Sequence, residues 1–136
     1  MTILAKKRLW LCLPPFTFCM LDQALTLWNQ SQQYWSGNYD VALEGNPIMQ
    51  RLLSQHPIIY EAGLIGWIVL FLLLIISLPK RVGMTLSVGI TFGHLWGVVS
   101  WIMYTAFYGY WICLALILVA GLLIVVGLER YNSLSE

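Results

Sequence analysis

The stretch from Val82 to Leu128 contains 47 consecutive residues without an Asp, Glu, Lys or Arg. A helix needs about 20 mainly apolar residues to cross a bilayer, so this run predicts two crossings. The aromatic segment 108–111, Tyr-Gly-Tyr-Trp, offers the turn between them. Only 10% of the 136 residues are charged, and the mean hydropathy is +0.77. Soluble domains carry about 25% charged residues, so we expect an integral membrane protein.

Two further apolar runs complete a prediction of four spans. Residues 62–79 are 18 uncharged residues and predict a third crossing. Residues 9–28 predict the fourth, although Pro14 and Pro15 interrupt this run and Asp22 lies inside it. We therefore predict an all-α polytopic membrane protein with a single domain, residues 1–136. Its four transmembrane helices would form a bundle, at about 9–29, 58–78, 82–107 and 110–129.

Basic residues predict the orientation of this bundle. With four crossings, the basic residues at positions 6–8, 80–81 and 130 all fall on one side, which the positive-inside rule makes cytoplasmic. Arg51 falls on the other side, in an outer loop of residues 30–57. Both termini would then be cytoplasmic, in the inner (plasma) membrane of a prokaryote. The aromatic residues that map to the outer boundary, as an aromatic belt would, are Trp28, Tyr34, Trp35, Tyr39, Tyr60, Tyr104, Tyr108, Tyr110 and Trp111.

The outer loop contains a compact polar corner at residues 44–47, Glu-Gly-Asn-Pro. Asn46 is a favourable helix N-cap, and Pro47 fits the first helical position because the missing N–H has no partner there. Apolar residues then share one face, which predicts a short amphipathic helix over residues 47–55 at the outer interface. Gly45 allows a sharp turn just before the cap.

Polar residues inside the spans are the candidates for function, because a charge in the bilayer is costly and needs a partner. Asp22 lies roughly 10 Å inside the outer boundary, with Thr26 and Asn29 on the same helical face. In the third predicted span, His94 and Trp101 belong to a polar stripe. The candidates for a binding site or polar network are Asp22, Thr26, Asn29, Glu44, Asn46, Glu61, His94 and Trp101.

These candidates suggest a site below the outer interface. Asp22, Glu44 and Glu61 would converge there, with His94 as the floor, and the Glu44 corner would cover the Asp22 site as a lid. His94 lies nearer the bilayer middle, so its contact with Asp22 requires tilt or a bend at the prolines. Clustered carboxylates need a positive partner, which Arg51, a proton, a metal or a ligand would supply.

Two other residue types are interpreted as packing features. Gly89, Gly93 and Gly97 follow a GxxxGxxxG pattern, which permits close approach of helices in membranes. The three cysteines lie within spans, lack metal-ligand spacing, and are expected to be buried small apolar residues. Trp67 and Trp96 are interpreted as packing or lipid-facing aromatics.

The Asp22–Thr26 pair and the E-x-N-P corner at residues 44–47 resemble a family of small prokaryotic four-span membrane proteins of uncharacterised function. The resemblance covers about residues 20–80. A lysine expected in the second span of that family is missing here, where Glu61 and apolar residues stand instead. A fainter similarity, to the four-span sterol-binding or sterol-isomerase fold, rests on acidic residues in spans one and two and a histidine in span three, here Asp22, Glu61 and His94.

Three classes of function follow. The first is an accessory or structural subunit of a membrane complex, which the glycine stripe and the lack of a soluble domain favour; its partners would be other subunits or further copies of the chain. The second is a module that binds a lipid-like or cationic ligand in an outward-facing acidic and aromatic pocket. The third is an intramembrane enzyme that uses a metal or acid–base pair, although no hydrolase or phosphate-loop motif supports it. The net charge of +1 argues against nucleic-acid binding. No cofactor follows from the sequence.

Overall fold

The computed structural model describes the backbone of residues 3–133 and the side chains of residues 8–132. Residues 1–2 and 134–136 of the predicted domain lie outside the described residues, as do the side chains of Lys6 and Lys7. Within the described chain the structure is all-α, without a strand. Its elements are α1 (Ile3–Trp28), α2 (Gln32–Trp35), the 3₁₀-helix η1 (Tyr39–Val41), α3 (Pro47–Leu53), α4 (Pro57–Ser77), α5 (Lys80–Thr105) and α6 (Gly109–Ser133).

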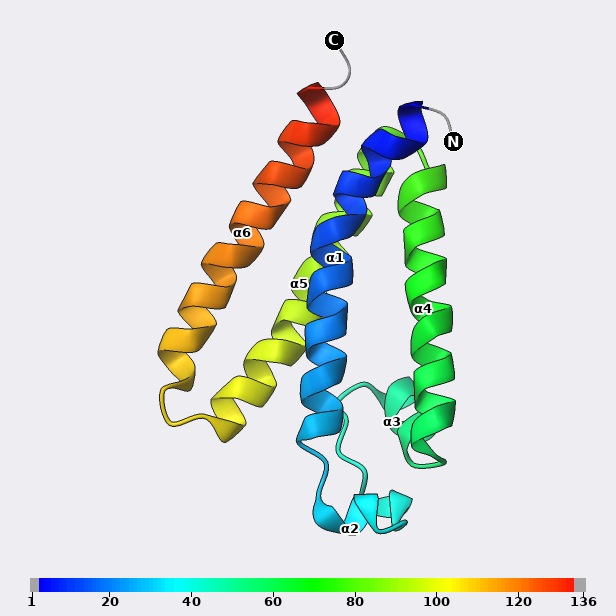
Figure 1. Ribbon diagram of the computed structural model, residues 1–136, viewed down its shortest axis with the longest axis vertical. Coiled ribbons are helices and arrows are strands. Elements are labelled where there is room, and N and C mark those ends of the chain that lie inside the picture. The colour runs from blue at the N-terminus through cyan, green and yellow to red at the C-terminus, as the bar shows by residue number, and fades with distance from the viewer. Residues whose placement is uncertain (1–2, 134–136) are drawn as a thin grey trace.

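Four long helices run side by side, with α1 in contact with α4, α5 and α6 (Figure 1). The described parts of both chain ends lie at one end of the bundle. The short elements α2, η1 and α3 lie at the other end, which we call the loop end and which also holds the turn between α5 and α6. Among the described residues, three helices are long and apolar enough to cross a membrane: α4, α5 and α6. The structure thus fits a membrane protein.

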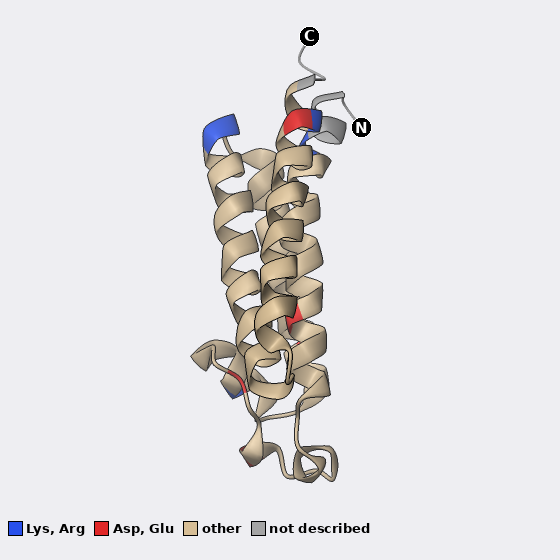
Figure 2. Cartoon of the chain, turned by 90° about the vertical axis from the view of Figure 1, so that its left-hand side faces the viewer, with Lys and Arg blue, Asp and Glu red and all other residues tan. Residues whose placement is uncertain are grey.

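Charge is distributed along the bundle as an apolar medium requires. Most of the basic residues lie at the end with the termini, and the middle of the bundle is almost free of charge (Figure 2). At the termini end, the Arg8 guanidinium donates to the carbonyls of Ile76 at 2.5 Å and Leu78 at 2.6 Å. These carbonyls belong to the last turn of α4 and to its cap, where intrahelical donors are lacking. Arg8 thereby ties α1 to the end of α4.

The prolines of α1 do not break the helix, which is continuous from Ile3 to Trp28 with Pro14 and Pro15 inside it. Each proline lacks the N–H that would bond to the carbonyl four residues earlier. Pro15 therefore frees the carbonyl of Leu11, which accepts a hydrogen bond from the Ser87 hydroxyl of α5 at 2.5 Å. Pro14 likewise frees the carbonyl of Trp10, and α6 approaches it closely at Gly127. The proline pair thus creates two contact points for neighbouring helices.

The predicted glycine stripe behaves differently at its three positions. A Cβ atom added at Gly89 or Gly93 would meet no described atom within 4 Å, so neither glycine closes a helix contact within the chain. A Cβ atom at Gly97 would collide with the Asp22 carboxylate, 2.7 Å from its Cγ. The tight backbone approaches lie elsewhere, at Gly83 against the Ile75 carbonyl and at Gly127. Within one chain, Gly97 is therefore the one glycine of the stripe that closes a contact, and it does so with Asp22 of α1.

The core consists of apolar side chains from all four long helices. Cys12, Cys19 and Cys113 are free and buried, as the sequence predicts. At the loop end, Tyr34 and Leu53 are fully buried together with Tyr60 of α4, and the Tyr34 hydroxyl donates to the Leu53 carbonyl. This cluster anchors the short elements of the loop end on α4. It fixes the position of the polar corner that precedes α3.

Candidate functional site

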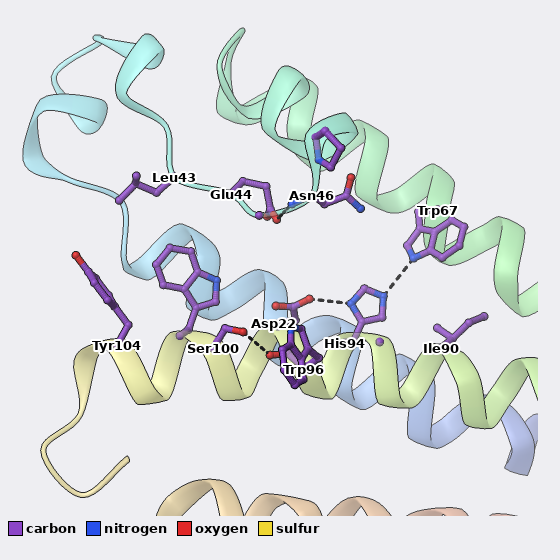
Figure 3. A pocket seen from close by; sticks show the side chains of 15 residues that line it. Asp22, Leu43, Glu44, Asn46, Trp67, Ile90, His94, Trp96, Ser100 and Tyr104 are labelled. Carbon is purple, nitrogen blue, oxygen red and sulfur yellow. Dashed lines mark hydrogen bonds and ion pairs between the residues drawn. The ribbon is translucent and has the colours of Figure 1, made fainter. Parts of the chain in front are cut away.

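A pocket of about 900 Å³ lies against α5 near the loop end, between α1, α4 and the segment that leads into α3 (Figure 3). Its volume is within the range of about 300–1,000 Å³ that is usual for small-molecule sites. No described residue of α6 lines it. The lining residues are Asp22 of α1, Leu43–Pro47, Trp67 of α4, and Ile90, Gly93, His94, Trp96, Gly97, Ser100, Trp101 and Tyr104 of α5.

Asp22, His94 and Trp67 form a hydrogen-bonded chain across three helices. Nδ1 of His94 lies 2.8 Å from Oδ2 of Asp22, and the indole Nε1–H of Trp67 donates to Nε2 of His94 at 3.2 Å. An indole N–H is only a donor, so Nε2 must be the acceptor in this pair. The proton of the neutral imidazole then lies on Nδ1, facing the carboxylate. Both ring nitrogens of His94 are therefore occupied.

Gly97 makes the contact between Asp22 and His94 geometrically feasible. It lies one turn beyond His94 on α5, and the Asp22 carboxylate occupies the space that a side chain would fill there. The side chains of His94 and Asp22 are only 15% and 16% exposed. The two residues are 72 positions apart and come from the helices α1 and α5, which pack against each other.

Two further bonds hold α1 close to Asp22, one to α5 and one to α4. The Trp101 indole donates to the Thr26 hydroxyl at 2.9 Å, and the Tyr60 hydroxyl donates to Oε1 of Gln23. Thr26, Gln23 and Tyr60 are all buried. These bonds fix the rotation of α1 relative to α4 and α5, and so they set the direction in which Asp22 points.

Glu44 lies across the pocket from Asp22 (Figure 3). Its Oε1 accepts from the backbone N–H of Asn46 at 2.8 Å, and its Oε2 lies 3.5 Å from the Tyr60 hydroxyl. Burial raises the pKa of this carboxyl above its ordinary value, and the charge of Asp22 adds to the rise, although the Asn46 N–H opposes it. Asn46 itself caps α3, with Oδ1 accepting from Ile48 N at 3.0 Å. α3 begins at the predicted Pro47 and ends at Leu53 rather than at residue 55.

The remaining candidates from the sequence lie outside this pocket. The amide of Asn29, just beyond α1, donates to the Leu25 carbonyl in the last turn of that helix, and Glu61 is half-buried on α4 without lining the pocket. Arg51 is exposed on α3 and makes no salt bridge to a described carboxylate. In the described residues, no group of three or more His, Cys, Asp and Glu side chains is arranged to hold a metal ion.

The pocket also contains residues that the sequence did not single out for a site. Trp67 bonds to His94, and Trp96, Ser100 and Tyr104 line the wall. Ser100 and Tyr104 share a helical face with Gly97 and Trp101, at spacings of three and four residues. That periodicity around His94 is the signal that could have found them.

No family model, curated protein or solved structure matches this chain. The resemblance to small prokaryotic membrane proteins stays a prediction. Function therefore has to be argued from the site alone.

Proposed function

We propose that this chain is a four-span membrane protein that binds an amphipathic small molecule in the pocket beside α5. The observation that carries the proposal is the composition of the pocket wall: apolar and aromatic side chains over most of its surface, with Asp22, Glu44 and His94 at one region. Pockets of this size with a few convergent polar groups are the usual form of small-molecule sites.

The four-span topology is part of the proposal. α1 has 26 residues, which at 1.5 Å per residue gives roughly 39 Å, enough to cross a bilayer. It lies beside three helices that are apolar enough to do so. Its polar side chains have partners on those helices, as an intramembrane helix requires. In this topology the loop end faces outward and both termini are cytoplasmic.

The geometry does not favour His94 as a catalytic base. A general base needs a free lone pair within reach of the substrate. Nδ1 of His94 faces Asp22 and Nε2 accepts from Trp67, so the ring offers no free nitrogen to the pocket. His94 instead holds Asp22 in place.

The test is to fill the pocket without disturbing the helices. Gly93 lines the pocket, and a Cβ atom there meets no described atom within 4 Å, so Gly93→Phe should place a ring in the cavity. Gly89→Phe is the matched control, since Gly89 is equally open but does not line the pocket. We expect small molecules that co-purify in mild detergent with the wild type and Gly89→Phe to be lost from Gly93→Phe. Equal recovery from all three proteins would contradict the proposal.

A second candidate function, an accessory subunit, is favoured by one observation. The open positions Gly89 and Gly93 leave room on α5 for a helix of another chain. In that case Gly89→Phe should release a stoichiometric partner, seen as a lower mass of the intact detergent-solubilised assembly. Ligand binding alone predicts an unchanged mass for this variant.

A further inference from the structure

The polar region of the pocket has an unbalanced charge. Its lining residues include two carboxylates, Asp22 and Glu44, and neither Lys nor Arg. Arg51, on the same end of the bundle, is exposed on α3 and does not line the pocket. A cationic head group would supply the missing charge. A head group with a phosphate would find no basic side chain to neutralise it.

The two carboxylates also have unused hydrogen-bond capacity. Oδ2 of Asp22 is engaged by His94, whereas Oδ1 has no hydrogen-bond partner among the described residues. Oε1 of Glu44 is engaged by the Asn46 N–H, and the Gly45 N–H also lies against this carboxylate. The Tyr60 hydroxyl is 3.5 Å from Oε2, but it also bonds to Gln23, so Oε2 keeps acceptor capacity. Both free oxygens are acceptors, so the complementary head group carries N–H donors as well as positive charge.

The rest of the wall suits a hydrocarbon body. Trp67, Trp96, Trp101 and Tyr104 contribute aromatic surface, which packs against alkyl chains and also attracts cations. Trp96 and Tyr104 are 76% and 79% exposed, so surface beside the pocket remains for the ligand to cover. This aromatic wall is independent of the two carboxylates, and it points to the same amphipathic class of ligand.

We propose that the ligand is a single-chain amphiphile with a primary ammonium head, which donates to Oδ1 of Asp22 and Oε2 of Glu44 while its chain lies along the aromatic wall of α5. This inference rests on the proposed binding function and names the class of ligand. A primary ammonium has three N–H donors, enough for both carboxylates, whereas a quaternary ammonium has none.

The test compares four probes with the same chain length: dodecylamine, dodecyltrimethylammonium, dodecanol and dodecanoate. Each is titrated calorimetrically into the full chain in nonionic detergent, and partition into empty micelles is subtracted. Charge-assisted hydrogen bonds contribute about 1.5–3 kcal/mol each, so dodecylamine should bind at least about tenfold more tightly than dodecanol. Dodecyltrimethylammonium should fall between them, and dodecanoate should bind most weakly.

Three variants assign the preference to the two carboxylates. Asp22→Asn and Glu44→Gln should each reduce the preference for dodecylamine over dodecanol several-fold. Glu44→Gln lies in a loop, so it keeps the test informative if Asp22→Asn misfolds. Asp40→Asn, which removes an exposed carboxylate of the same loop outside the pocket, should retain the preference.

The outcomes separate this inference from the proposed function. If dodecanol binds as tightly as dodecylamine, or if both carboxylate variants keep the amine preference, the ammonium head is wrong and the binding function stands. If no probe shows saturable binding that Gly93→Phe abolishes, the binding function itself fails. A preference for dodecyltrimethylammonium over dodecylamine would overturn the inference. It would mean that contact of the cation with the aromatic wall, and not hydrogen bonding to the carboxylates, selects the ligand.

Discussion

At the scale of single residues, the site depends on a glycine as much as on its polar side chains. The Asp22 carboxylate lies where a side chain at position 97 would be, so the smallest residue on α5 determines how close α1 can bring its charge. A buried carboxylate that is displaced by even a methyl group loses the geometry of its hydrogen bond to His94. Asp22, His94 and Gly97 therefore act as a unit.

Gly97→Ala tests this unit. The added methyl collides with the Asp22 carboxylate, and overpacking of this kind costs about 1–3 kcal/mol. Gly89→Ala is the matched control on the same helix; with no described atom within 4 Å, it should be neutral or more stable by about 0.5–1 kcal/mol. Unfolding in mixed micelles with increasing denaturing detergent measures both. Equal stabilities of the two variants would mean that Asp22 does not occupy this space.

The raised pKa of Glu44 leads to a prediction about how stability depends on pH. Burial, with the Asp22 charge, raises its pKa above the ordinary value of 4.5, so the folded chain holds this proton to a higher pH than the unfolded chain does. Stability should therefore fall as the pH rises from about 4.5 through the raised pKa. Glu44→Gln cannot titrate, and its melting temperature should fall less over this interval than that of the wild type. The neighbouring groups Asp22 and Tyr60 are common to both proteins.

The control for this measurement is Asp40→Asn, whose exposed carboxylate should leave the wild-type pH dependence unchanged. An identical pH dependence in Glu44→Gln and the wild type would show that Glu44 is solvated in the folded chain. The comparison is made without ligand, because a bound cation would favour the ionised carboxylate and reverse the trend.

At the scale of elements, α1 is held by bonds that its own prolines make available. Ser87→Ala leaves the Leu11 carbonyl without the hydroxyl and should destabilise the fold by about 1 kcal/mol, a typical value for hydrogen bonds between membrane helices. In a Pro15→Ala background, the restored N–H can bond to Leu11, so the same Ser87→Ala change should cost less. A double-mutant cycle on unfolding free energies measures the difference. Simple additivity would contradict the link between Pro15 and Ser87.

The elements differ in how far local sequence predicts them. The ends of α3 and α4 follow from nearby signals, since Asn46 caps one helix and Pro47 and Pro57 open both. The continuity of α1 does not, because the hydroxyl that bonds to one freed carbonyl and the helix that packs closely on the other lie far along the chain, at Ser87 and Gly127. From the local sequence alone, a proline pair predicts that the helix is interrupted. Only the packed bundle shows what compensates for it.

The same limit applies to the site. Asp22, Glu44 and His94 stand out in the sequence as polar residues of an apolar chain, which is why they became candidates. Depth estimates along straight parallel helices place His94 well below Asp22. They also place Glu61 in the site, whereas Glu61 does not line the pocket. Helix tilt and rotation arise from distant contacts such as Trp101 with Thr26. No local pattern encodes them.

At the scale of the whole molecule, the proposed topology can be tested by labelling. Asp40→Cys lies in the loop end and Lys80→Cys at the first residue of α5, both exposed. In intact cells, a membrane-impermeant maleimide should label position 40, and position 80 should react only after permeabilisation. The wild-type chain, whose three cysteines are buried, gives the background. Reversal of the two patterns would contradict the proposed orientation. Labelling of both sites in intact cells would mean that α4, which lies between them, does not cross the membrane.

The central position of α1 imposes an order on biosynthesis. It is the first long helix to leave the ribosome, yet, among the described long helices, only α1, although 26 residues long, falls short of the apolarity expected of a span. Asp22, Thr26 and the freed carbonyl of Leu11 find their partners on α5, which is translated after α4. In the proposed topology, nascent α1 would therefore wait beside the insertion machinery, or at the lipid surface, until α5 arrives. Translation order and assembly order would then differ in this small bundle.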